Sequence, residues 1–167
     1  GVGIIAADEA ADNGLRVLPP SDGLQAELKE IWPPAGVGNP IDLTAQIMND
    51  RSLFPTFVDA CLNEGAYDSI VLGMTYMGLL DPWTEQLVEG LATARANHPD
   101  APFYVTTLSR PEIRQQVEEL GIPVFEDVST AVRVLGRVTD YALRRQRFEN
   151  ERAARTDATA PAVAPEL

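Results

Sequence analysis

The stretch Asp68-Ser-Ile-Val-Leu-Gly-Met74 decides the fold, because it is short, apolar and rich in β-branched residues. A second stretch, Pro102-Phe-Tyr-Val-Thr-Thr-Leu108, has the same character. Short continuous apolar runs of this kind are typical of strands in parallel sheets that are buried on both faces. Residues 15–18 (Leu-Arg-Val-Leu) and 122–125 (Ile-Pro-Val-Phe) are weaker candidates for strands of the same sheet.

Amphipathic helical patterns fill the intervals between these strands. Leu53, Phe57 and Cys61 recur at helical spacing, and Gly65 follows where a carboxyl-terminal cap belongs. The other expected helix boundaries are an end at Asn13-Gly14, a start at Asp81, a capping box at Ser109-Arg-Pro-Glu112, an end at Gly121 and a start at Asp127. Strands that alternate with helices predict an α/β fold, with a parallel sheet covered by helices on both faces.

The start of the chain differs from this pattern. Residues 1–14 are predicted to form the end of a Gly-rich turn that runs directly into a helix. In an α/β unit a strand precedes such a turn, and no strand sequence is present here. We therefore expect that the first strand of the sheet is missing from this chain or is supplied by a partner.

Composition limits the function classes. The 167 residues suffice for one domain with one sizeable core. Thirteen basic and 25 acidic residues give a net charge of −12, which disfavours binding to nucleic acid or to anionic membranes. One cysteine cannot form an internal disulfide, and one histidine cannot build a His-rich metal site. No apolar run is long enough to span a bilayer and no signal segment opens the chain, so we expect a cytoplasmic protein.

Charge and composition change towards the carboxyl terminus. Residues 1–140 carry eight basic and 21 acidic residues, whereas residues 141–167 carry five arginines and four acids. Residues 149–167 are rich in Ala, Thr and Pro and have few large apolar side chains, so burial cannot offset their ordering entropy. We expect one domain over residues 1–148 and a disordered tail or linker over residues 149–167.

The opening turn is the first candidate site. Gly1, Val2 and Gly3 stand at the start of the first helix, where free backbone N–H groups and the helix dipole favour an anion such as phosphate. The alternative is a tight turn that needs small residues for structural reasons alone.

Two further loops expected at the ligand-binding edge of the sheet, one of them after the Pro33-Pro34 break, supply candidates for the edge of an active site. Asn39, Pro40 and Asp42 lie in one such loop, and they could orient it or simply form an Asx-type turn. Thr75 and Gly78 lie in the loop after the 68–74 strand, which is apolar enough to serve instead as a packing surface for another domain.

The sequence contains no complete catalytic apparatus. His98 falls between a helix and the following strand, on the amino-terminal side of the sheet and away from the ligand-binding edge. Cys61 lies on an apolar helix face, as a core residue does. No Ser/His/Asp triad, no GxxxxGK[ST] phosphate loop and no complete GxGxxG motif is present. Arg110 could bind an anion, but a solvated arginine beside a helix start is the commoner outcome.

Four motifs together suggest a family. They are the opening Gly1-x-Gly3-(x)4-Asp8, the segment Asn39-Pro-Ile-Asp-Leu43, the segment Gly121-Ile-Pro-Val-Phe125 and the helix Ala131-Val-Arg-Val-Leu135. In this combination the chain, from Gly1 to about Tyr141, resembles the C-terminal flavodoxin-like domain of nucleoside-diphosphate-forming acyl-CoA synthetases, relatives of succinyl-CoA synthetase. The resemblance implies a three-layer flavodoxin-like domain with a parallel sheet.

The resemblance also implies a role in a reversible, ADP-forming acid–CoA ligase that works through an acyl phosphate and a phosphohistidine. CoA, ATP/ADP and Mg²⁺ would be bound by the complete enzyme, through a CoA-binding domain, a phosphohistidine domain and an ATP-grasp domain on the same or a partner chain, and an oligomer is expected. This chain would be non-catalytic. Gly1, Val2 and Gly3 would steady the phosphohistidine, with Asn39, Pro40 and Asp42 as the matching NPxD segment.

The chain departs from that family at two positions, and two other function classes are alternatives. His98 does not lie in a Gly-rich phosphorylatable loop, and the loop at Thr75–Gly78 lacks the Gly-Gly turn of the succinyl-CoA synthetase branch. The chief alternative is a flavodoxin-like binding or assembly module without ligase activity. A flavin carrier is a weaker alternative, because the Ser/Thr-rich phosphate turn of such proteins is absent.

Overall fold

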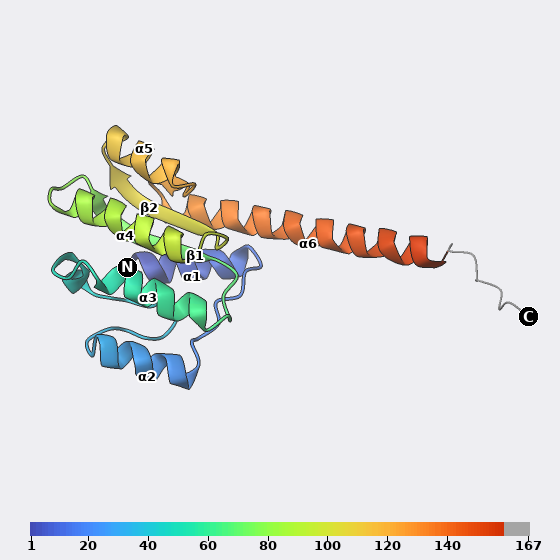
Figure 1. Ribbon diagram of the computed structural model, residues 1–167, viewed down its shortest axis with the longest axis horizontal. Helices are drawn as coiled ribbons and strands as arrows, with labels where there is room; N and C mark the ends of the chain where they lie inside the picture. Colours follow the sequence, from blue (N-terminus) through green and yellow to red (C-terminus); the bar gives the residue numbers. More distant parts are fainter. Residues whose placement is uncertain (159–167) are drawn as a thin grey trace, which may run out of the picture.

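A computed structural model of the protein describes residues 1–158 and shows an α/β fold. Three parallel strands form the sheet in the order β1-β2-β3 (Figure 1), with bounds β1 Ile70–Gly78, β2 Phe103–Ser109 and β3 Val124–Phe125. The predictions of strands near residues 68–74, 102–108 and 122–125 are therefore confirmed. The order and direction of the strands fit the flavodoxin-like arrangement that we expected.

The prediction of a strand at residues 15–18 is wrong. Leu15 and Val17 pack against the core formed by Ala10, Val128 and Val132, as alternate residues of a strand would. The segment nevertheless pairs with no strand among the described residues, and the backbone N–H of Leu15 donates instead to Ala10 O at 2.9 Å, at the end of the first helix. Alternating apolar residues make an extended segment, but a strand also needs a hydrogen-bonding neighbour.

The helices follow the predicted boundaries closely. They are α1 Val2–Asp12, α2 Asp22–Ile31, the short 3₁₀ helix η1 Ala45–Met48, α3 Leu53–Asn63, α4 Trp83–Asn97, α5 Pro111–Glu119 and α6 Val128–Ala158. Gly14, Gly65 and Gly121 follow α1, α3 and α5 with φ between 72° and 74°, the left-handed conformation that glycine adopts most easily. Asp127 accepts a hydrogen bond from the Thr130 N–H at 2.8 Å and caps α6.

Two helix starts differ from the prediction. Helix α4 begins at Trp83 with Pro82 as its N-cap residue, and the Asp81 carboxylate accepts hydrogen bonds from the side chains of Thr84 and Arg110. The capping box at Ser109 is also wrong. Ser109 is the last residue of β2, and α5 begins at Pro111 without a side-chain cap.

The helices form layers on the two faces of the sheet. α3, α4 and α5 bury the main core against one face, with Phe103 and Leu91 fully buried in it. α1 and α6 cover the other face through a smaller cluster that includes Val132 and Val71. α2 packs on α3, outside the layer that touches the sheet (Figure 1).

Helix α6 leaves the body of the molecule. Its first turns pack on the sheet, but from Asp140 to Arg155 every side chain is exposed, and Figure 1 shows the helix projecting as a rod. Residues 149–158, which we expected to be disordered or a linker, are helical because Arg, Glu and Ala favour a helix without burial, aided by ion pairs such as Arg145–Glu149. The rest of that expected tail, residues 159–167, lies outside the described residues. Among the described helices none, α6 included, is both long and apolar enough to cross a bilayer.

Candidate functional site

The amino terminus of α1 has the features of an anion site. Gly1 is its N-cap residue, no side chain among the described residues caps it, and no acid lies in its first turn. The N–H of Ile4 is used within the turn, donating to Gly1 O at 3.1 Å. The N–H groups of Val2 and Gly3 have no such partner in the described part of the chain, so the positive end of the helix dipole is left without a counter-charge.

This terminus contacts two of the segments that the sequence singled out. A β-carbon on Gly3 would stand 2.9 Å from the Cβ of Pro40, and one on Gly73 would stand 3.0 Å from the Cγ1 of Val2. The structure thus brings the opening turn, the Asn39–Asp42 loop and strand β1 together. A β-carbon on Gly1 would have no atom within 4 Å, so a side chain at this position would meet no neighbour among the described residues.

Asn39 and Asp42 use their side chains to hold the loop. The Asn39 amide donates to Leu18 O at 2.9 Å, and the Asp42 carboxylate accepts from the Thr44 N–H at 2.8 Å in an Asx-type turn. Asp42 and Gly36 also exchange two backbone hydrogen bonds of 2.8 Å. These contacts match the structural alternative, in which the loop residues position Pro40 against Gly3.

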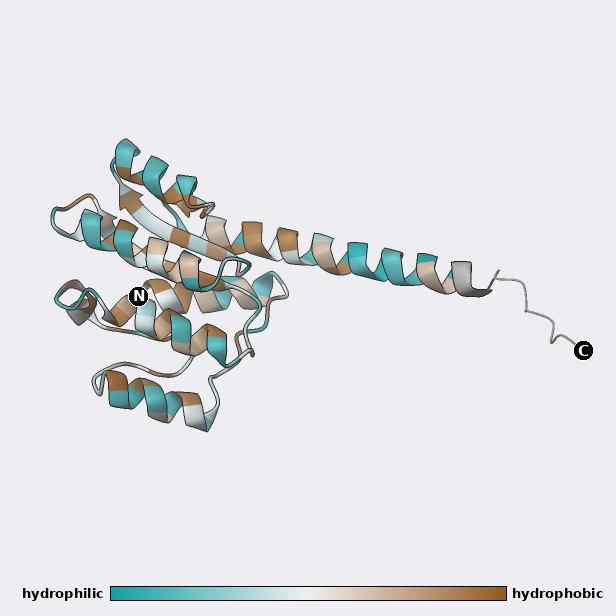
Figure 2. Cartoon of the chain, viewed as in Figure 1, coloured by the Kyte–Doolittle hydropathy of each residue, from teal (hydrophilic) through white to brown (hydrophobic). Residues whose placement is uncertain are grey.

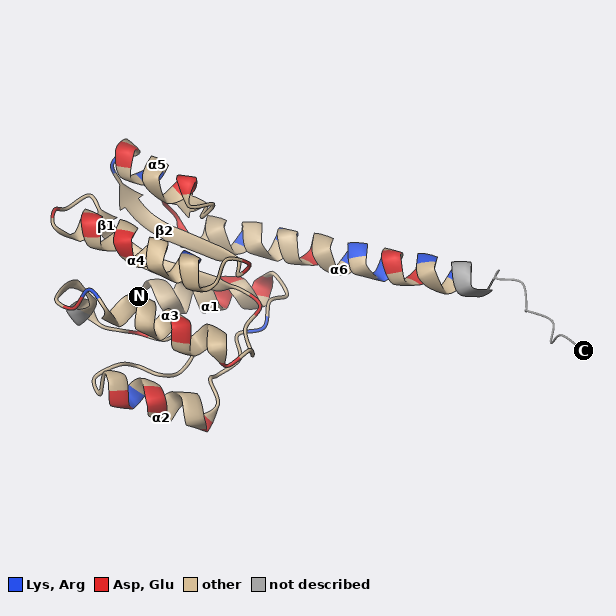
Figure 3. Cartoon of the chain, viewed as in Figure 1, with Lys and Arg blue, Asp and Glu red and all other residues tan. Residues whose placement is uncertain are grey.

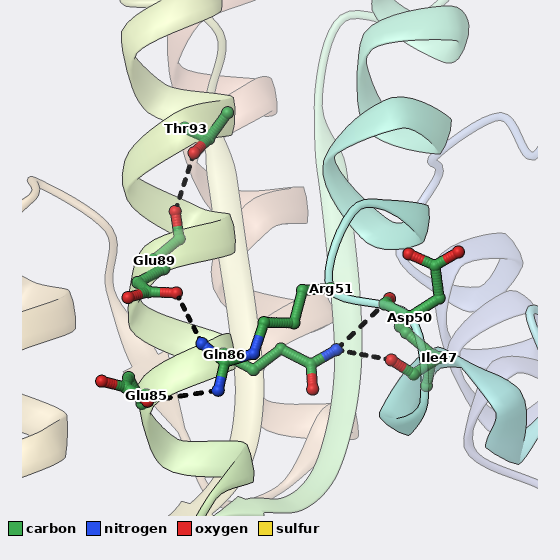
Figure 4. A network of polar contacts seen from close by, with 7 residues as sticks. All are labelled: Ile47, Asp50, Arg51, Glu85, Gln86, Glu89 and Thr93. Carbon is green, nitrogen blue, oxygen red and sulfur yellow. Dashed lines mark hydrogen bonds and ion pairs between the residues drawn. The ribbon is translucent and has the colours of Figure 1, made fainter.

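A polar network fixes the chain that follows this loop, and no local sequence pattern predicts that network. The buried Gln86 side chain on α4 donates to the backbone oxygens of Ile47 and Asp50 (Figure 4). Beside it, the Arg51 guanidinium bridges Glu85 at 3.2 Å and Glu89 at 3.1 Å. Helix α4 therefore holds η1 and the turn after it, and with them the end of the candidate loop.

Thr75 and Gly78 lie where β1 becomes irregular. The pairing register with β2 shifts on both sides of Thr75, which has a φ of 46°, unusual for a β-branched residue. Gly78 is buried, and a β-carbon there would stand 2.4 Å from the Cβ of Ser109. Close packing between the strand ends thus accounts for Gly78, while Thr75 is exposed at the same edge of the sheet.

The buried Thr107 holds this irregular segment in place. Its hydroxyl lies 3.1 Å from Thr75 O and 3.0 Å from Leu108 O, to which it can donate, and it accepts from the Gly78 N–H at 3.3 Å. Sequence reasoning placed Thr107 at the end of the 102–108 strand but gave it no role, because a threonine in a buried strand has no distinguishing local pattern.

Arg110 is neutralised within the chain. Its guanidinium forms two hydrogen bonds to Asp81, at 2.9 and 3.3 Å, and its Nε lies 3.3 Å from Glu112. The hydrogen bond to Arg110 is the main reason that the pKa of Asp81 lies below its ordinary value. Two carboxylates around one arginine leave it poorly suited to bind an added anion.

The residues that could act as acids, bases or nucleophiles lie elsewhere. His98 is the C-cap residue of α4, and its Nε2 lies 2.9 Å from Asp59, on the amino-terminal side of the sheet as expected. Cys61 is buried, and burial together with nearby Glu64 and Glu27 raises its pKa to about 11, so the thiolate is suppressed. Within residues 1–158 no group of His, Cys, Asp and Glu side chains could hold a metal ion.

Comparisons of the chain with protein-family models, with curated proteins and with solved structures find no match. What the fold and the site define is a parallel α/β domain whose first helix presents an uncapped amino terminus beside a fixed proline loop.

Proposed function

We propose that this chain is a non-catalytic domain of an ATP-dependent, ADP-forming acid–CoA ligase. In this role the amino terminus of α1 stabilises a phosphohistidine that another domain of the enzyme contributes. CoA, ATP/ADP and Mg²⁺ are bound by the companion domains, and the acid–CoA bond is formed there.

One observation carries the proposal: the N-cap residue of α1 is a glycine, which has no side chain to cap the first N–H groups of the helix. Aligned backbone N–H groups stabilise phosphate charge without a titrating side chain, and they require no reorganisation when the phosphate arrives. Two of the four motifs that resemble the ligase family meet at this terminus, because Gly3 contacts Pro40 of the NPxD segment.

The positions of the histidine and the cysteine favour a non-catalytic role for this chain. The lone histidine is paired with Asp59 and the lone cysteine is held as a protonated thiol in the core. The isolated chain should therefore show no ligase turnover.

The test is phosphorylation of the companion histidine in the longer protein or complex that contains this chain. That assembly is incubated with γ-labelled ATP and Mg²⁺, and acid-labile phosphohistidine is measured. Gly1→Val adds bulk over the free N–H groups at a position with no neighbouring atoms, and we expect it to reduce phosphohistidine formation. Gly23→Val, on the distant helix α2, is the matched control and should leave phosphorylation unchanged.

Full phosphorylation of the Gly1→Val protein would overturn the assignment of the phosphate site. Absence of any phosphohistidine or CoA-dependent turnover in the complete wild-type assembly would reject the ligase itself and favour a binding or assembly module.

A further inference from the structure

The side of α6 that faces away from the sheet carries an apolar stripe that no other part of the described chain covers. Val134, Val138, Tyr141 and Phe148 are all exposed, the two aromatic residues at 66% each. Successive members are four, three and seven residues apart, which is the heptad spacing of helices that pair side by side. Arg145 and Arg152 occupy the two remaining positions of the same line.

The stripe faces away from the body of the molecule. Val132, Leu135 and Gly136, on the other side of α6, are buried against the sheet and α1. In Figure 2 hydrophobic turns lie where α6 leaves the body, and most of the rod beyond them is hydrophilic. A helix that projects into water with large apolar side chains on one line has the form of one half of a helix pair.

We propose that the stripe binds the same stripe of a second copy of this chain, with the two α6 helices antiparallel. Antiparallel pairing about a two-fold axis near residue 143 places Val138 against Phe148 of the partner subunit. It also stacks Tyr141 on Arg145 of the partner subunit, a favourable cation–aromatic contact. Val134 then lies along the aliphatic part of Arg152 of the partner subunit.

The two arginines in the stripe select the antiparallel direction. In a parallel, in-register pair Arg145 would face Arg145 of the partner subunit, and Arg152 would face its own counterpart, so like charges would meet at two levels of the interface. The antiparallel pair removes both repulsions, because each arginine faces an aromatic or aliphatic side chain.

Charges beside the stripe also fit this direction. Residues 137 and 151 flank the stripe at the same heptad position, two heptads apart. Antiparallel pairing therefore puts Arg137 next to Glu151 of the partner subunit, and the two-fold symmetry repeats this contact once. Neither side chain has an ion-pair partner among the side chains that the structure describes. Ala142, close to the axis, is small enough for the helices to approach.

The distribution of net charge favours the same arrangement. Residues 1–140 carry a net charge of −13, while residues 141–158 carry five arginines and three acids (Figure 3). If the two α6 helices are antiparallel, the two acidic bodies lie at opposite ends of the pair with the basic helices between them. If the helices were parallel, the two acidic bodies would lie together.

Sedimentation of the full chain tests the proposal. We expect a dimer, and the double variant Tyr141→Asp/Phe148→Asp should weaken dimerisation by roughly a hundredfold or more, since two large apolar side chains are lost. The double variant Gln146→Asp/Ala153→Asp adds the same charge on the other side of α6 and should remain a dimer. A wild-type chain that is monomeric at roughly 0.5 mM, or a dimer that survives Tyr141→Asp/Phe148→Asp, would overturn the proposal.

A charge exchange tests the direction of the pair. Arg137→Glu and Glu151→Arg should each weaken the dimer, and the double exchange should restore it, because opposite charges then face each other again. Failure of the double variant to recover would reject the antiparallel register. All these positions are exposed, and the helical circular dichroism signal checks that each variant is folded.

Discussion

Gly3 and Pro40 are in such close contact that a β-carbon on Gly3 would stand 2.9 Å from the Cβ and 3.3 Å from the Cγ of the proline. Residues 37 positions apart in the sequence thus fix the angle at which α1 begins. The absence of a side chain at residue 3 is explained by this contact, independently of any phosphate.

The contact predicts that Gly3→Ala is destabilising. In an exposed helix the change from glycine to alanine would add up to about 1 kcal/mol of stability. Here the new methyl group must displace the proline, and such overpacking costs about 1–3 kcal/mol, so we expect a net loss in the free energy of unfolding. Urea denaturation measures it, with Gly1→Ala, where the space is open, as the control. Equal stability of the two variants would show that Pro40 can move away from the new methyl group without a loss in the free energy of unfolding.

Thr107→Val should destabilise the protein by about 1–3 kcal/mol, because the buried N–H of Gly78 and carbonyl of Thr75 lose their partner while the side-chain volume stays the same. Denaturant midpoints give the difference. Thr93→Val, on the exposed side of α4, removes a comparable hydroxyl and should change stability by no more than about 0.5 kcal/mol. A Thr107→Val protein as stable as the control would mean that water replaces the hydroxyl.

Acid should weaken the fold through three aspartates. Hydrogen bonds, from Ser52 to Asp50, from Arg110 to Asp81 and from Thr130 to Asp127, lower the pKa of each carboxyl below 3.8 in the folded protein. Because the pKa values are higher in the unfolded chain, this stabilisation is complete at neutral pH and is lost as the pH falls through 3.8 and below. Urea titrations between neutral pH and pH 3 measure the loss.

Asp127→Asn isolates one of these three contributions. The variant should be less stable than the wild type at neutral pH, and its stability should fall less steeply in acid. An unchanged acid slope would show that the Asp127 carboxyl does not titrate differently in the two states.

The Cys61 thiol should be unreactive while the protein is folded. Its pKa of about 11 means that the thiol stays protonated at pH 8, and its burial excludes reagents. We expect negligible reaction with a disulfide reagent at pH 8 in the native state, and one thiol per chain in guanidinium chloride. Rapid labelling of the native protein would indicate that α3 opens readily.

Local sequence signals were sufficient for most of the fold. Gly65 and Gly121 mark helix ends because a left-handed residue is needed there, and Asp127 marks a helix start because its carboxylate reaches an N–H three residues on. Each of these signals acts over a few residues. Two predictions that failed depend on distant neighbours: residues 15–18 have no pairing strand among the described residues, and Ser109 meets Gly78 at the end of a strand instead of capping a helix.

The candidate site was predictable in part. The opening turn and the Asn39–Asp42 loop were singled out from the sequence, and the structure places Gly3 against Pro40. The anchors of that loop were not predictable, because Asn39 bonds to Leu18 and Gln86 bonds to Ile47, across 21 and 39 residues. Hydrogen bonds over such separations depend on the packing of whole elements.

The separation of charge between the body and α6 gives the molecule a permanent electric dipole directed along the rod. A single chain should therefore orient in an applied electric field, and at neutral pH its basic end should be retained weakly on a cation exchanger despite an isoelectric point near 4.4. Two such dipoles lying antiparallel, side by side, cancel, so retention on the resin would show whether the α6 helices are unpaired.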